Sequence, residues 1–411
     1  MVTLRRRSAL LTSTALGGLL CVGAPFLTGF DGYDAKACAF DGRVIVSCNE
    51  DPDGPSEFIL LYDPVPDNDS LIEELFIFND FEGSESISTP ILSPGPFVFE
   101  GNDFLGLQVG FDGILTVDDS ASDWGSGDDT FFVADGLLEL PGGLIGGAGD
   151  DVFTIDGGTV GGSLLGEVGD DTFAILDGEV RGDLLGGEGS DMFAVDRGTV
   201  VGRLLGEAGN DIFDISGGSV SNIEGGDGDD SVTVAGSAQV GSVIGGSGND
   251  TFTLNGGSVF GDVFGDLGND TFTVTGGVLL GNGDTTFGNI VGGLGNDTFT
   301  VTSGTVTGSL LGEAGEDSFN IEGGTVQGNI VGGDTDDADT ISIAGGMLEG
   351  SAFGGGGNNR FTVSDGKVQG DLSGGEGNDT FLVTGGTVAG SLRGWTGEDR
   401  CPSSDFSGHL S

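Results

Sequence analysis

Residues 292–311 read GGLGNDTFTVTSGTVTGSLL, and variants of this twenty-residue unit recur about a dozen times along the chain. Each unit carries one large apolar residue, which we call the anchor, at a fixed place. The anchors are Phe131, Phe153, Phe173, Phe193, Phe213, Val232, Phe252, Phe272, Phe299, Phe319, Ile341, Phe361 and Phe381. A fixed period of this length is typical of stacked supersecondary units, because no single unit can bury its apolar face alone. We therefore expect one elongated repeat body.

Alternation of polar and apolar residues within the unit predicts short strands. In Thr251-Phe252-Thr253-Leu254, Phe252 should point inward, between equivalent rings above and below, while the threonines face solvent. The 86 glycines exclude helices, and neither the three-residue period of collagen nor the composition of a disordered chain is present. We predict an all-β fold, a right-handed parallel β-solenoid (β-helix or β-roll) of about 13 coils with roughly 20 residues per coil.

The chain is strongly acidic. It has 66 Asp plus Glu against 12 Lys plus Arg, which gives a formal net charge of −54. Such a surface repels nucleic acid, so we expect no nucleic-acid partner. The charge fits either of two interpretations, solubility of a long surface or specific cation binding. Only the register of the acidic residues along the repeat can separate them.

Residues 1–37 are predicted to form a signal peptide. Three consecutive arginines, Arg5 to Arg7, precede an apolar run of small residues, and Ala35-Lys36-Ala37 supplies a cleavage site. An anchoring helix is the alternative, but glycines and Pro25 interrupt the apolar run. A plain secretory signal is favoured over a twin-arginine signal, because no bound cofactor is implied.

Residues 38–123 are predicted to be an N-terminal cap region with irregular coils, because the repeat is degenerate there and an exposed solenoid end needs covering. In an oxidising compartment Cys38 and Cys48 are expected to form a disulfide. A metal site is the competing interpretation, but no Cys or His partners stand at metal-ligand spacing.

Residues 124–394 carry the solenoid repeats, and residues 395–411 are predicted to be a non-repetitive tail. The repeat breaks off in mid-unit there, with Cys401 at the place where the next anchor is due. This break predicts a truncation or frameshift product. A natural cap is the alternative.

The turn before each anchor is acidic at one fixed position. The column comprises Asp129, Asp151, Asp171, Asp191, Asp211, Asp230, Asp250, Asp270, Asp297, Asp317, Asp339 and Asp379, with Asn359 as the exception. Stacked carboxylates about 4.8 Å apart would repel one another by roughly 1 kcal/mol per pair even in water. Either each carboxylate accepts backbone N–H groups of its own turn, or Ca²⁺ ions bridge adjacent turns through oxygen ligands.

The sequence GGSGNDTFT at residues 245–253 resembles the RTX (haemolysin-type) calcium-binding nonapeptide. Five other turns match it fully, beginning at Gly146, Gly186, Gly225, Gly292 and Gly374. The resemblance implies Ca²⁺ as the cofactor. It carries over Asp151, Asp191, Asp230, Asp250, Asp297 and Asp379 as metal ligands. The family's nonapeptides run in tandem, whereas here an acid-poor half follows each one, so at most one edge could bind ions.

Taken together, the export signal, the cap region and coils such as GGTVAGSL at residues 385–392 resemble the passenger region of a bacterial autotransporter. The resemblance implies export across the inner membrane of a Gram-negative bacterium, to the cell surface or outside the cell, or to the periplasm if the chain is truncated. It implies a structural or adhesive role, with ligands on host or neighbouring-cell surfaces as partners. Contact with the outer membrane is expected only through a barrel domain missing from this chain. The alternative is an RTX-like calcium-binding secreted protein.

We expect no enzyme activity and no small-molecule substrate. Catalytic clefts need convergent acids, bases or cationic groups, and the only histidine of the chain is His409 in the tail. Paired acids such as Asp170-Asp171 repeat in coil after coil, which marks them as structural columns.

Overall fold

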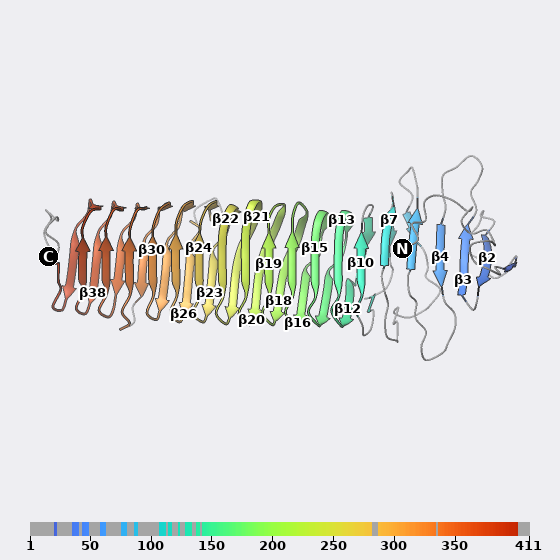
Figure 1. The fold of residues 1–411 in the computed structure, drawn as a ribbon, viewed down its shortest axis with the longest axis horizontal. Helices are drawn as coiled ribbons and strands as arrows, with labels where there is room; N and C mark the ends of the chain where they lie inside the picture. The colour runs from blue at the N-terminus through green and yellow to red at the C-terminus, as the bar shows by residue number, and fades with distance from the viewer. Residues whose placement is uncertain are drawn as a thin grey trace.

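The computed structural model describes the backbone of nine strands between residues 20 and 123, and then residues 128–133, 137–139 and 142–401 except for 282–286 and 334–335. The chain winds along the axis of a long rod (Figure 1). Several sequence predictions lie outside the residues whose side chains are described. They are the signal peptide with its cleavage site, the Cys38–Cys48 disulfide and the tail from residue 402 onward.

The first strands form a separate antiparallel sheet. Its members are β1 (Leu20–Val22), β2 (Ala35–Phe40), β3 (Arg43–Cys48) and β4 (Phe58–Tyr62). From β5 onward every described pairing is parallel and joins a strand to its equivalent in the next coil. The described residues therefore form an all-β parallel solenoid with about 20 residues per coil, as the sequence predicted.

The parallel strands form three columns. The anchor column contains β5 (Leu75–Asn79), β7 (Leu107–Phe111), β10 (Thr130–Val133), β17 (Met192–Val195), β19 (Ile212–Ile215), β24 (Thr271–Val274), β27 (Thr298–Val301), β30 (Ser318–Ile321), β33 (Thr340–Ile343), β36 (Arg360–Val363) and β39 (Thr380–Val383). The short column contains β6 (Ser86–Ser88), β8 (Ile114–Thr116), β11 (Leu137–Glu139), β25 (Val278–Leu279), β28 (Thr305–Val306), β31 (Thr325–Val326), β34 (Met347–Leu348), β37 (Lys367–Val368) and β40 (Thr387–Val388).

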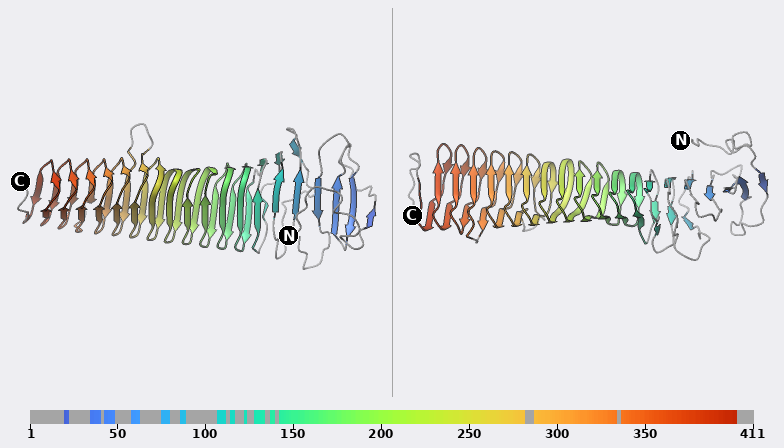
Figure 2. Two further views of the ribbon diagram at one scale, coloured as in Figure 1. Left: turned by 45° about the horizontal axis from the view of Figure 1, so that its top comes forward. Right: turned by 60° about the horizontal axis from the view of Figure 1, so that its bottom comes forward.

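The third column contains β9 (Ser122–Asp123), β12 (Leu144–Ala148), β14 (Leu164–Val168), β16 (Leu184–Glu188), β23 (Val263–Leu267), β26 (Ile290–Leu294), β29 (Leu310–Ala314), β32 (Ile330–Gly333), β35 (Ala352–Gly355), β38 (Leu372–Glu376) and β41 (Leu392–Thr396). Longer strands run through more than one column. They are β13 (Val152–Val160), β15 (Thr172–Val180), β18 (Thr199–Ala208), β20 (Ser219–Asp227), β21 (Ser231–Ser247) and β22 (Thr251–Val259). The columns stay aligned along the rod in two further views (Figure 2).

Each coil adds apolar side chains from all three columns to one continuous core. In one coil Phe319 and Ile321 come from the anchor column, Val326 from the short column and Ile330 from the third column, and all four are fully buried. Their neighbours along the strands point outward, in the alternation that a pleated strand imposes. The inward assignment of Phe252 and Leu254 is confirmed by their burial.

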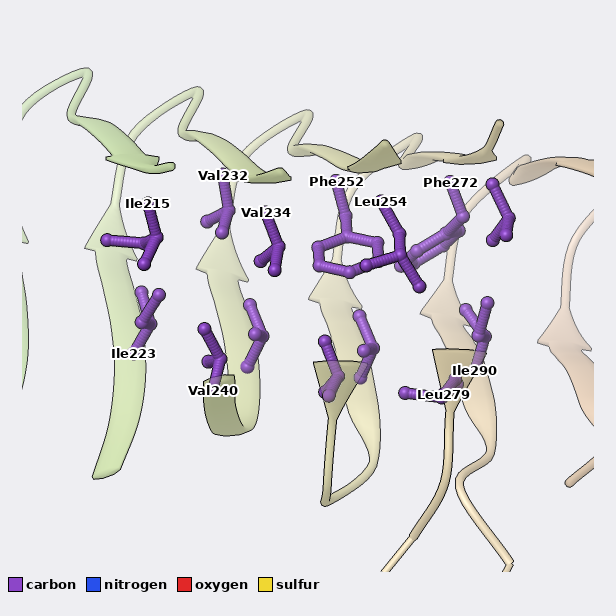
Figure 3. Packing of buried hydrophobic residues seen from close by; sticks show 14 of the residues in the cluster. Ile215, Ile223, Val232, Val234, Val240, Phe252, Leu254, Phe272, Leu279 and Ile290 are labelled. Carbon is purple, nitrogen blue, oxygen red and sulfur yellow. The ribbon is translucent and has the colours of Figure 1, made fainter. Parts of the chain in front are cut away.

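The predicted ladder of rings exists but is interrupted in the middle of the rod. Rings stack with centroids 4.6 to 4.9 Å apart from Phe131 to Phe213, from Phe272 to Phe319, and between Phe361 and Phe381. The prediction that Phe252 lies between rings above and below is wrong, because Val232 is its register partner in the preceding coil. Figure 3 shows the two side chains at equivalent places on adjacent strands.

Coil pairing continues beyond residue 394, where the tail was predicted to begin. Strand β41 includes residues 395 and 396, and the Phe381 N–H donates to the Arg400 carbonyl at 2.9 Å. Cys401 packs against the apolar core at the anchor place of this coil. The stacked body therefore extends to the last residue that the structure describes.

Candidate functional site

One long edge of the rod is formed by the turns that join third-column strands to anchor-column strands. In one coil β26 ends at Leu294 and β27 begins at Thr298, so the chain reverses within three residues. Gly293 and Gly295 take φ values of 115° and 134°, which favour glycine and allow this tight reversal. The turn places Asp297 inside the rod with 1% of its surface exposed. We call this line of turns the acidic edge.

The aspartates of these turns form a line that we call the buried aspartate row. Its members are Asp129, Asp151, Asp171, Asp191, Asp211, Asp230, Asp250, Asp270, Asp297, Asp317, Asp339, Asn359 and Asp379, all of them buried. The structure therefore brings all six predicted calcium ligands into one line. It adds the aspartates of turns that do not match the nonapeptide, because the stacking depends on the period and not on the full motif.

From Asp151 onward, the Oδ1 atom of each member of the buried aspartate row accepts a backbone N–H of the preceding coil. The Asp171 N–H donates to Asp191 Oδ1 at 2.7 Å. Equivalent hydrogen bonds of 2.7 to 3.0 Å join each coil to the next along the rod. The first has the Asp129 N–H as its donor, and the last has Asp399 Oδ1 as its acceptor. The expectation that these oxygens accept N–H groups of their own turn is thus wrong. Parallel stacking brings each Oδ1 within reach of the neighbouring coil instead.

The residues one position before the buried aspartates form an outer row, in which the hydrogen bonds between coils run in the opposite direction. The Asp170 N–H donates to Asp150 Oδ1 at 2.9 Å, so here a side chain accepts from the following coil. Asn249, Asn269 and Asn296 continue the pattern through their Oδ1 atoms. Each turn is therefore clamped to both neighbouring coils. Such paired inter-coil bonds fix the register of the stack, because a slip by one residue would break both rows.

A third row of side-chain acceptors, which was not predicted from the sequence, lies at the turns before the third-column strands. The Ser309 N–H donates to Asn289 Oδ1 at 2.9 Å, and the Ser351 N–H donates to Asn329 Oδ1 at 2.9 Å. The available signal was a Ser, Asp or Asn placed directly before the first apolar residue of the strand, as in Asn289-Ile290.

In ten of the buried aspartates the second carboxylate oxygen has no hydrogen-bond donor. These atoms are the Oδ2 atoms of Asp151, Asp171, Asp191, Asp211, Asp230, Asp250, Asp270, Asp297, Asp317 and Asp379. A glycine makes room for each one. A methyl group on Gly166 would overlap Asp171 Oδ2, and the Gly186 carbonyl oxygen of the next coil would lie 2.6 Å from that methyl group. A carboxylate oxygen without a donor and a backbone carbonyl oxygen thus lie beside the same glycine.

Burial makes the charged form of these carboxylates costly. Desolvation raises the pKa of Asp171, Asp191, Asp230 and Asp317 to about 7, against the lowering effect of the backbone hydrogen bond from the preceding coil. Desolvation likewise raises the pKa to about 6 at Asp151, Asp211, Asp250, Asp297, Asp339 and Asp379. Carboxylates that repel one another in a desolvated line need a positive partner or a proton.

Further acids stand at the second glycine position of the turn, in a conformation that disfavours them. Glu167, Glu207, Asp266 and Glu313 have φ values from 75° to 80°, and their side chains are exposed. A residue other than glycine in the left-handed region costs about 1–3 kcal/mol. These acids increase the negative charge of the acidic edge at a cost in backbone strain.

The chemistry of the acidic edge fits a hard cation. All convergent groups are oxygen atoms, from buried carboxylates and from glycine carbonyls of the next coil, and Ca²⁺ prefers such ligands. Within the described residues, no cluster of three or more His, Cys, Asp or Glu side chains is placed to hold a metal ion. Backbone carbonyls would therefore have to supply most of the ligands.

Comparison with solved structures agrees with the fold. No protein-family model and no curated relative matches the sequence. The chain is similar to the crystal structure of a hyperactive, Ca²⁺-dependent, β-helical antifreeze protein from an Antarctic bacterium, with a TM-score of 0.51 and 28% sequence identity. The similarity covers 61% of this chain and 78% of the antifreeze protein. None of the described residues forms a helix suited in length and hydropathy to crossing a membrane.

Proposed function

We propose that this protein is an exported, acidic β-solenoid that binds Ca²⁺ along its acidic edge and serves as a rigid structural or adhesive module. The observation that carries the proposal is the line of buried Oδ2 atoms without donors, several of which lie beside a glycine carbonyl oxygen of the next coil. Buried charges in proteins are paired or coordinate metals, because an isolated buried charge is unstable. A cation between coils would neutralise the carboxylates and tie each coil to the next.

The Ca²⁺-dependent β-helical antifreeze protein supports the choice of ion, since it shares the fold with 28% identity. The ion would be held by Oδ2 of the buried aspartates and by glycine carbonyls, and would supply charge neutralisation and inter-coil bridging. The chain's own residues supply the rest of the stacking, because Oδ1 already holds the N–H of the preceding coil. In this proposal calcium adds stability to a stack whose register is set without it.

We base the structural or adhesive role on the shape of the rod and on the scarcity of cationic side chains among its described residues. The stacked coils form a long rod (Figure 2), along which ligands on host or neighbouring cells would bind. The described cations Arg181, Arg203 and Arg393 lie in exposed ion pairs with nearby carboxylates. We propose that the protein is not an enzyme, and that it travels as an autotransporter passenger or, in the alternative, as an RTX-like secreted protein.

Calcium titration of the full chain tests the proposal. Chelated protein is titrated with Ca²⁺ by calorimetry, and its melting temperature is followed up to millimolar Ca²⁺. We expect cooperative binding and a melting temperature that rises with ion concentration, because an ion that binds only the folded state stabilises it by mass action. Mg²⁺ serves as the control, since its smaller octahedral shell fits carbonyl-lined sites poorly. Absence of binding heat together with an unchanged melting temperature would overturn the proposal.

A second candidate function is ice binding, favoured by the hydroxyl-rich outer face of the anchor column. Between residues 231 and 342 the outward positions are Ser231 and Thr233, Thr251 and Thr253, Thr271 and Thr273, Thr298 and Thr300, Ser318 and Asn320, and Thr340 and Ser342. Parallel register aligns them in two straight lines, which we call the threonine face. The similar β-helical protein is described as an antifreeze protein.

The ice-binding candidate is tested by measuring thermal hysteresis of the protein in Ca²⁺. Thr273→Tyr places a bulky ring in the middle of the threonine face, whereas Ala174→Tyr places one on the same face of a coil outside it. We expect Thr273→Tyr to abolish any hysteresis and Ala174→Tyr to leave it in place. A wild-type protein without hysteresis at high concentration eliminates this candidate.

A further inference from the structure

Asn359 is the one residue of the described buried aspartate row that is not an aspartate, and it keeps the backbone clamp. Its Oδ1 accepts the Asp339 N–H at 2.9 Å, and its own N–H donates to Asp379 Oδ1 at 2.8 Å. The replacement therefore leaves the Oδ1 function unchanged. What differs is the second terminal atom, which is a nitrogen with two protons instead of an oxygen.

Unlike the Oδ2 atom of a buried aspartate, the Asn359 amide nitrogen has hydrogen-bond partners in the chain. Nδ2 donates to the Gly356 carbonyl at 2.9 Å and to the Gly374 carbonyl at 3.3 Å. The Asn359 Nδ2 atom occupies the place that Asp171 Oδ2 occupies in its own coil. A methyl group on Gly354 would overlap Asn359 Nδ2 and lie 2.6 Å from the Gly374 oxygen, just as one on Gly166 would overlap Asp171 Oδ2 and lie 2.6 Å from the Gly186 oxygen.

The backbone of this turn also differs from that of its neighbours. Gly357 has a φ of 82°, whereas Gly295, Gly315 and Gly377 at the equivalent place have values of 134°, 133° and 125°. In this altered turn the Gly356 carbonyl accepts an amide proton. The turn is thus closed by hydrogen bonds within the chain.

We infer that Asn359 is a built-in substitute for a bound cation, so that the row takes ions at its aspartate coils and none at this coil. The inference rests on the proposed calcium binding. An aspartate coil needs a positive group beside its buried Oδ2 atom, because that atom has no hydrogen-bond donor. A carboxylate must obtain that group from solution as a cation, whereas the carboxamide carries it as N–H. The coil of Asn359 is therefore independent of calcium, within a rod that calcium stabilises at its aspartate coils.

Hydrogen–deuterium exchange of the full wild-type chain tests the inference coil by coil. The expected result is that Ca²⁺ slows amide exchange about tenfold or more in the peptide that contains Asp191, and changes it less than about twofold in the peptide that contains Asn359. Equal slowing in the two peptides overturns the inference while leaving calcium binding intact. No slowing anywhere overturns both, and the calorimetric titration then shows the failure of the calcium proposal by itself.

Matched substitutions supply a second measurement. Native mass spectrometry should show one more bound Ca²⁺ for Asn359→Asp and one fewer for Asp191→Asn, relative to the wild type. Asn359→Asp should also melt at a lower temperature in EDTA and recover in Ca²⁺. If Asn359→Asp fails to fold, Asp191→Asn still decides the matter: unchanged ion number in a folded Asp191→Asn protein overturns the inference.

Discussion

Two lines of equivalent residues run along the rod and accept replacement very differently. The line of inward anchor residues, which we call the ring column, contains Val232 and Ile341 in place of phenylalanine. Both are as deeply buried as the rings. The buried aspartate row contains a single replacement between residues 129 and 379, and Asn359 keeps the acceptor Oδ1. An apolar core position needs approximate volume, whereas a hydrogen-bond position needs an acceptor atom at a fixed place.

The largest expected difference between the two lines is in how pH changes the free energy of unfolding. A change of pH acts on the whole buried aspartate row and leaves the rings unchanged. Burial raises the pKa of these aspartates from 3.8 to about 6 or 7. Between pH 4 and pH 7 the folded state then binds more protons than the unfolded state, so the free energy of unfolding falls as pH rises. This stability is present below pH 4 and is lost as the pH passes through 6 to 7.

In EDTA, scanning calorimetry should therefore show a melting temperature that increases steadily from pH 8 to pH 5. In Ca²⁺ the dependence should become weaker, because the ion requires ionised carboxylates. A melting temperature that is flat in EDTA over this range would mean that the row is already neutralised or is not buried.

The next largest effect is expected in the ring column. Phe173 stacks between Phe153 and Phe193 at 4.8 and 4.9 Å, so Phe173→Ala should cost about 3–5 kcal/mol of unfolding free energy. Phe252→Ala should fall at or below the lower end of that range, since its ring has Val232 on one side. Urea unfolding measures both. Thr172→Ala, on the outer face, is the control and should change stability by less than about 0.5 kcal/mol.

Substitutions in the buried aspartate row should lower the free energy of unfolding by less than those in the ring column. The loss should depend on whether the substitution removes Oδ1 or only the charge. Asp191→Ala leaves the Asp171 N–H without its acceptor and should cost about 1.5–3 kcal/mol in EDTA. Asp191→Asn keeps the acceptor and should cost less than about 1 kcal/mol, as the wild-type Asn359 suggests. Equal destabilisation by the two variants would show that charge, and not the Oδ1 hydrogen bond, holds the coils together.

The smallest effect concerns the strained acids of the acidic edge. Glu207 has a φ of 76°, so Glu207→Gly should raise the unfolding free energy by about 1 kcal/mol. Glu188→Gly is the matched control, because Glu188 is exposed on the same edge and has no positive φ. Glycine there should destabilise by about 0.5–1 kcal/mol. A loss of calcium affinity with Glu207→Gly would assign this carboxylate to the ion site.

The sequence was sufficient for the strand faces, because these depend on alternation within a few residues. Phe252 and Leu254 were assigned inward and Thr253 outward from a run of four residues, and their burial agrees. The ring contacts of Phe252 were not predicted correctly. They depend on which residue occupies the same place one coil away, and the average period hid the valine at position 232.

Sequence alone thus determined the period, and through it the solenoid, the inward anchors and the existence of an acidic column, since each follows from spacing along the chain. The tertiary structure decided what the acids do. Asp191 Oδ1 accepts the N–H of a residue twenty positions earlier, and Asp191 Oδ2 is left without a hydrogen-bond donor. The distinction between the two oxygens of one carboxylate arises only when coils stack. Donors and acceptors that are far apart in the sequence then become neighbours, because the parallel register places equivalent residues of successive coils side by side.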